Sequence, residues 1–217
     1  MVCCLPGARV WDVSDQVHDI LVQEGKQPEV VIHVGTNDIG RKKDEVLKCE
    51  FRELGRRLKN RTSRVAFSGL LPVLHDSDGF GNTSPLEVGK TDKDRADFLL
   101  TLMNAVGLQT PVLISPSMSG RFSIPFVMFH NQRLKGFVPV APIGTNAYSA
   151  EQYQKIQTPT LIVFGEQDTN LGVQSLKNLR HLPHHNIIKI PTAHHACYLD
   201  EPKKFHDALL DFLTKLQ

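Results

Sequence analysis

The sequence predicts an α/β fold in which a mostly parallel sheet carries helices on both faces. Short apolar runs alternate with segments of helical periodicity along the 217 residues. The runs at residues 112–114 and 160–164 are apolar apart from Thr160, which is typical of strands covered on both faces. The segments between the runs have the lengths of crossover helices, as βαβ units require.

The first part of the chain begins this alternation. A helical face closed by Gly25 precedes a buried strand at residues 30–34, and a second helical face precedes a strand at residues 65–67. The apolar residues of these two helical faces are Val13, Val17, Ile20 and Leu21, then Leu47, Phe51, Leu54 and Leu58. Residues 73–90 are rich in Gly, Ser and Asp and predict no element.

The second part continues the alternation to the end of the chain. Helices are predicted at residues 98–106, closed by Gly107, at 171–182, and at 205–216 after Pro202. Strands are predicted at residues 112–114, 137–140, 160–164 and 186–190. The loops after these strands share one edge of a parallel sheet, where ligands bind in such folds.

The loop after residues 112–114 resembles a nucleophile elbow, the sharp strand-to-helix turn that presents a serine. It reads Ser115-Pro116-Ser117-Met118-Ser119-Gly120, with serines where the usual G-x-S-x-G motif has glycines. Small residues are needed there because the strand and helix backbones nearly touch, and the strained turn pushes the central hydroxyl outward. The alternative is a Ser-rich loop in which Ser117 only caps a helix.

Two further residues complete a triad pattern. Asp168 follows the strand at 160–164, and His195 follows the strand at 186–190. The chain order Ser, Asp, His is that of α/β-hydrolases. Neutral imidazole can take the serine proton, and the carboxylate can hold the imidazole tautomer. The backbone N–H of Met118 is then the expected oxyanion donor. The alternatives are a turn-forming Asp168 and a surface-loop His195.

The segment from about residue 78 to 217 resembles the alpha/beta-hydrolase domain-containing protein 14 family, the A-type more than the B-type members. The resemblance rests on the Ser115–Gly120 elbow and on three further stretches: residues 79–82, 136–142 and 195–199. It implies an α/β-hydrolase fold and assigns the triad to Ser117, Asp168 and His195. For B-type members it also implies acyl-group chemistry, including acetyl transfer from lysine to coenzyme A, which we do not extend to this chain.

Residues 1–75 depart from that family. The early strand ending in His-Gly, which supplies a second oxyanion donor, is absent. Instead, Gly35-Thr36-Asn37-Asp38 is similar to one block of the SGNH hydrolases, and the segment resembles an SGNH-like piece found with vertebrate retroelements. We therefore expect residues 1–75 to be a fused segment supplying replacement strands. Residues 76–217 would be the C-terminal portion of an α/β-hydrolase domain, packed with them as one globular unit, with the junction near residues 75–79.

The missing donor leaves three functional interpretations open. The first is a serine hydrolase or acyltransferase acting on an ester, thioester or other acyl group. The second is a non-catalytic α/β scaffold, because loss of one oxyanion donor lowers turnover roughly 10²–10³-fold in a well-studied protease. The third is an SGNH-type esterase using the N-terminal Gly35–Asp38 block, against which the absence of a Gly-Asp-Ser block counts. Asn37 is either a substitute oxyanion donor or a plain turn residue after the strand at 30–34.

Composition excludes several other classes. A net charge of +2 gives no reason to expect nucleic acid as a partner. The sequence contains no run of 18 apolar residues, so no membrane span is expected. No P-loop or dinucleotide motif is present, so no cofactor is expected. No metal is expected either, although five histidines crowd into residues 181–195, because no His-Glu-x-x-His motif occurs.

The spacing of the four cysteines fits neither a zinc site nor a disulfide framework, which favours a reduced, cytoplasmic setting. Cys197 is interpreted as a buried packing residue rather than a site residue. A small-molecule or acylated substrate is expected; the oligomeric state is not determined by the sequence.

Overall fold

The computed structural model describes the second half of the chain almost completely. The described residues are 11–16, 29–33, 49–50, 53–54, 56–57, 64–68, 91–105 and 108–216, with backbone only at 29–33, 64–68 and 105. Residues 11–16, 49–50, 53–54 and 56–57 are helical, within or beside the two predicted N-terminal helices. Gly25, Asn37, the loop at 73–90 and the expected junction lie outside the described residues.

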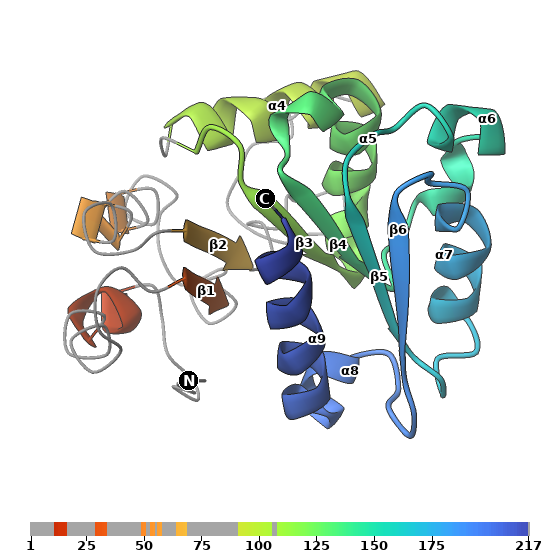
Figure 1. Cartoon of the computed structure of the whole chain (residues 1–217). Coiled ribbons are helices and arrows are strands. Elements are labelled where there is room, and N and C mark those ends of the chain that lie inside the picture. Colours follow the sequence, from red (N-terminus) through yellow and green to blue (C-terminus); the bar gives the residue numbers. More distant parts are fainter. Residues whose placement is uncertain are drawn as a thin grey trace, which may run out of the picture.

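The strands form one six-stranded sheet in which all described pairs are parallel and neighbours in space are neighbours in sequence (Figure 1). The strands are β1 Glu29–His33, β2 Arg64–Ser68, β3 Val112–Pro116, β4 Gly136–Val140, β5 Thr160–Gly165 and β6 His185–Ile190. Each predicted strand is present and shifted by no more than two residues at either end. Since the strands are parallel, the loops that follow them lie at one edge of the sheet.

Two apolar clusters lie on the two faces of this sheet. One joins α4 Asp92–Ala105, α5 Gly120–His130 and α7 Leu171–Leu179 to Phe137 and Ile162 of the strands. The other joins α9 Pro202–Lys215 to Val138 and Val163. Alternate strand residues point to opposite faces, so neighbours such as Phe137 and Val138 pack in different clusters. The predicted α/β architecture with helices on both faces is confirmed.

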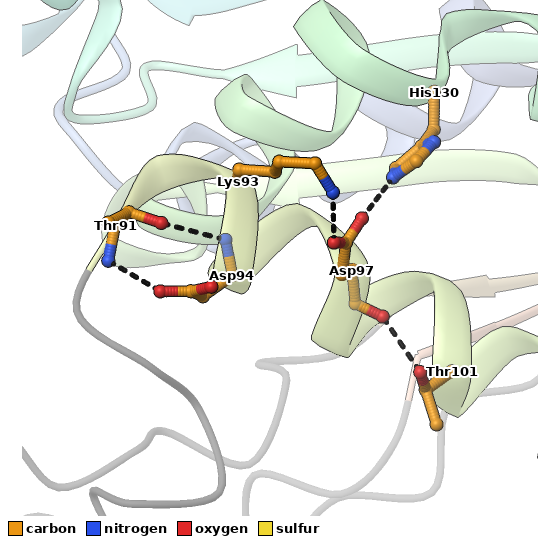
Figure 2. A network of polar contacts seen from close by, with 6 residues as sticks. All are labelled: Thr91, Lys93, Asp94, Asp97, Thr101 and His130. Carbon is orange, nitrogen blue, oxygen red and sulfur yellow. Dashed lines mark hydrogen bonds and ion pairs between the residues drawn. The ribbon is translucent and has the colours of Figure 1, made fainter.

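Helix α4 begins six residues before the predicted apolar face, because its first turn is capped by polar groups. The backbone N–H of Asp94 donates to Thr91 Oγ1 at 3.1 Å, and the N–H of Thr91 donates to Asp94 Oδ2 at 3.0 Å (Figure 2). This reciprocal pair satisfies two N–H groups that a helix start leaves free. The apolar periodicity of residues 98–106 could indicate only the later turns.

A polar network ties α4 to the C-terminal end of α5. His130 Nε2 lies 2.7 Å from Asp97 Oδ1, and Lys93 also pairs with Asp97 (Figure 2). These two contacts, that of Lys93 first, lower the pKa of Asp97. The network therefore fixes the helix that follows the elbow against its neighbour.

Other helices also differ from the sequence prediction, and α9 begins at Pro202, three residues before its predicted start. The four-residue helices α6 Ala150–Tyr153 and α8 Cys197–Asp200 were not predicted, because one turn shows no periodicity. A Ser149–Gln152 capping box marked the start of α6 in the sequence. Helix α7 ends at Leu179, three residues early, although Leu182 stays buried and so extends the apolar pattern.

Candidate active site

Three residues predicted from their chain order meet at the carboxyl edge of the sheet. Ser117 follows β3, Asp168 follows β5 and His195 follows β6. Ser117 Oγ lies 2.8 Å from His195 Nε2, and His195 Nδ1 lies 2.6 Å from Asp168 Oδ2. The three side chains thus form one continuous hydrogen-bonded chain across residues far apart in the sequence.

Ser117 sits in the strained turn expected of an elbow. Its φ is +45°, in the left-handed region that costs a non-glycine residue on the order of 1–3 kcal/mol. Among the described residues, the other non-glycine residues with positive φ are Ala141 and Thr192. They follow β4 and β6, so all three strained residues lie at the edge that holds Ser117.

The close approach beside Ser117 occurs at Gly120 rather than at Ser119. A Cβ at Gly120 would lie 2.3 Å from the carbonyl oxygen of Ile143, in the loop after β4. The N–H of Ile143 in turn donates to the carbonyl of Ser117 at 3.0 Å. Ser119 is buried, but its Oγ has no hydrogen-bond partner among the described residues. The small residue that this packing requires is therefore the glycine that opens α5.

The surroundings of Asp168 favour its ionised form. Its side chain is only 6% exposed, and burial alone would raise its pKa. The His195 hydrogen bond and the backbone N–H groups of Gly172 and Asn170 outweigh burial, so the net effect is a lowered pKa. An ionised carboxylate can only accept hydrogen bonds. His195 Nδ1 therefore carries a hydrogen and donates the hydrogen bond to Asp168 Oδ2. His195 Nε2 is then free to accept from the Ser117 hydroxyl.

The loop carrying His195 is held by contacts that the sequence did not indicate. Gly165, at the end of β5, would place a Cβ 2.2 Å from the carbonyl oxygens of both Ala193 and His194. The N–H of Gln167 donates to the Ala193 carbonyl at 2.9 Å. The N–H of His194 donates to Asp200 Oδ2 at 2.8 Å. The sequence indicates Gly165 only as part of a turn, and no pattern in the sequence predicts the contact of Asp200.

Met118 directly follows Ser117 in the short helix η1 Ser117–Ser119, and this residue is 46% exposed. This is the chain position from which the sequence predicts a backbone oxyanion donor. Asn37, the candidate for a second oxyanion donor, lies outside the described residues. This edge of the sheet therefore contains a hydroxyl, an imidazole and a carboxylate in contact, an arrangement capable of activating the hydroxyl.

No protein-family model matches the chain. Similar curated proteins are found. The chain is 51% identical over 154 residues to Protein ABHD14A of Danio rerio, covering 71% of this chain and 57% of that protein. It is 41% identical over 158 residues to the human protein named "Putative protein-lysine deacylase ABHD14B", covering 71% of this chain and 74% of the relative.

The chain belongs to the ABHD14 family. It spans 57% of the length of the Danio rerio ABHD14A relative and 55% of the human one, with 45% identity to the latter. The ABHD14 resemblance expected from the elbow and the flanking stretches is confirmed at the level of the family.

Solved structures support the fold of this ABHD14 chain. A predicted CIB-like hydrolase from Thermoplasma acidophilum superposes with a TM-score of 0.59 at 20% identity, covering 86% of each chain. Carboxylesterase CesB from Bacillus subtilis gives 0.57 at 14% identity, covering 88% of this chain and 84% of the esterase. The chain therefore has an α/β-hydrolase fold.

Three of the other four histidines in the crowded stretch of this ABHD14 chain have separate partners. His184 contacts Gln157, His185 contacts the Leu182 carbonyl, and His194 contacts Asp200. Within the described ranges, no group of three or more His, Cys, Asp or Glu side chains could hold a metal ion. Cys197 is fully buried in the α9-side cluster, as a packing residue would be. None of the helices described is long and apolar enough to cross a membrane.

Proposed function

We propose that this chain is a serine hydrolase or acyltransferase that cleaves an ester, thioester or other acyl bond through Ser117, His195 and Asp168. The observation that carries the proposal is the pair of contacts at His195: 2.8 Å from Nε2 to Ser117 Oγ and 2.6 Å from Nδ1 to Asp168 Oδ2. Membership of the ABHD14 family and the α/β-hydrolase fold support hydrolase chemistry.

In the proposed reaction, Ser117 Oγ attacks the carbonyl carbon of the acyl group while its proton passes to His195 Nε2. Asp168 stabilises the imidazolium that forms. The carbonyl oxygen becomes an oxyanion, toward which the N–H of Met118 would donate. His195 then returns the proton to the leaving alcohol, thiol or amine. Water, or another acceptor in a transferase, releases the acyl group from Ser117 by the same proton transfers.

The proposal is tested by labelling the full chain with a fluorophosphonate, which reacts with an activated serine. We expect labelling of the wild type, and none of Ser117→Ala or His195→Ala. His194→Ala is the matched control, since His194 is the adjacent histidine and is 76% exposed. This variant should label like the wild type.

The other two interpretations predict different labelling results. A folded wild type that is not labelled would favour the non-catalytic scaffold. Labelling that survives Ser117→Ala would point to another nucleophile, as an SGNH-type esterase requires. If labelling depends on Ser117, hydrolysis of an aryl ester, an acyl thioester and an acyl-lysine peptide would be compared. The acyl-lysine peptide is included because the name of the ABHD14B relative refers to protein-lysine deacylation.

We further propose that residues 1–75 are an SGNH-like segment that supplies replacement strands to the hydrolase portion, residues 76–217. The pairing of β2 with β3, at Ser68 and Ile114, supports this proposal. Removal of residues 1–75 should expose the edge of β3 and lower the urea midpoint of unfolding. A truncated chain as stable as the full chain would refute it.

A cytoplasmic location is part of the proposal, since Cys49 and Cys197 are free thiols.

A further inference from the structure

A buried pair of hydroxyl groups spans the elbow. Ser115 Oγ, in β3, lies 2.5 Å from Ser123 Oγ, in α5. Ser115 is 1% exposed and Ser123 is fully buried. Ser115 stands where the usual elbow motif has glycine, a residue that could not make this contact. The pair therefore joins the strand before Ser117 to the helix after it.

We propose that Ser115 and Ser123 are a positioning pair that holds Ser117 in its reactive geometry, an inference that rests on the proposed function. The strained backbone of Ser117 persists only if the surrounding structure fixes it on both sides. The loop after β4 fixes one side, where Ile143 N–H donates to the Ser117 carbonyl at 3.0 Å. The hydroxyl pair fixes the other, from within the strand–turn–helix unit.

The burial of the pair makes its loss hard to compensate. Neither hydroxyl is exposed enough for bulk water to replace its partner. Without the tie, the end of β3 and the first turns of α5 can separate slightly. Ser117 can then relax from its φ of +45°. The 2.8 Å contact of its hydroxyl with His195 would lengthen as a result. The pair thus acts on reactivity through the backbone of Ser117 and does not touch the substrate.

The pair can be separated from a merely structural contact by a double-mutant cycle. Ser115→Ala or Ser123→Ala alone leaves one buried hydroxyl without a partner and lowers stability. The double variant leaves no such hydroxyl and should regain most of that stability. A structural role predicts that reactivity recovers with stability, whereas a positioning role predicts that it does not.

The full chain would be measured in three ways: urea unfolding, the rate of fluorophosphonate labelling at Ser117, and hydrogen exchange of the Ile143 amide. Thr160→Val is the matched control. It removes another buried hydroxyl, which donates to the Thr158 carbonyl at 3.0 Å, at the opposite end of β5 from the loop that carries Asp168.

We expect the double variant to label roughly 10- to 100-fold more slowly than the wild type at near-wild-type stability. Its Ile143 amide should exchange at least about 10-fold faster, as local opening requires. Thr160→Val should change neither. Wild-type labelling and wild-type Ile143 exchange in the double variant would overturn the inference. If the wild type itself is not labelled, the proposed function fails, and Ile143 exchange alone decides whether the pair holds the elbow.

Discussion

Replacing Gly165 by alanine should slow the reaction at Ser117, although none of Ser117, Asp168 and His195 is substituted. The backbone of Gly165 is outside the left-handed region, so the effect of the added Cβ is steric. That Cβ would lie 2.2 Å from the carbonyl oxygens of Ala193 and His194, a separation that must grow to at least 3.0 Å. The loop bearing His195 therefore has to move by about 0.8 Å relative to β5.

A displacement of this size has two measurable consequences. Overpacking of backbone against backbone should lower the free energy of unfolding by about 1–3 kcal/mol. A shift near 1 Å at the imidazole should slow Ser117 labelling by roughly 10²-fold, because proton transfer depends on the 2.8 Å contact. The first would be measured by urea unfolding and the second by the rate of reaction with a fluorophosphonate.

Gly136→Ala provides the matched control. Its added Cβ would meet Leu216 Cδ1 at 2.8 Å and the Phe212 ring at 3.2 Å, at the other end of the sheet from the site. Both variants should lose stability, but only Gly165→Ala should lose reactivity. Gly165→Ala reacting at the wild-type rate, or both variants slowing equally, would refute the reasoning that the Gly165 contact positions His195.

Three further outcomes follow from the geometry. The lowered pKa of Asp168 means that its stabilisation is complete above its ordinary pKa of about 3.9 and is lost as the pH falls through the lower native value. Asp168→Asn should therefore lose less stability than the wild type between about pH 5 and pH 3 in urea titrations; equal losses would contradict this. Ser119→Ala removes a buried hydroxyl without a partner in the described structure and should raise the free energy of unfolding by about 1 kcal/mol. Ser175→Ala, which loses a 3.0 Å bond to the Gly172 carbonyl, should lower it, and the same sign in both would count against the assignment. Burial raises the pKa of Cys197 to about 11, so iodoacetamide at about pH 7.5 should modify the exposed Cys49 and spare Cys197 in the native chain, as mass spectrometry would show.

Prediction from the sequence succeeded where the signal is local. Apolar runs predicted β3, β4 and β5, since such runs suit strands covered on both faces, whereas β6 contains Asn186 and Lys189 and is largely exposed. The position of Ser117, Asp168 and His195 directly after predicted strands predicted that they share one edge, because parallel strands place their following loops there. The one-turn helices α6 and α8 escaped prediction because four residues complete only one turn.

The sequence alone determined which residue types follow which strands, and therefore which side chains could meet. It could not determine the contacts that hold them within hydrogen-bond distance. The approach of Gly165 to the His195 loop, of Gly120 to Ile143, and of Ser115 to Ser123 each joins separate elements. Only the tertiary structure decided these contacts, because they depend on the packed distance between backbones, which no single segment encodes.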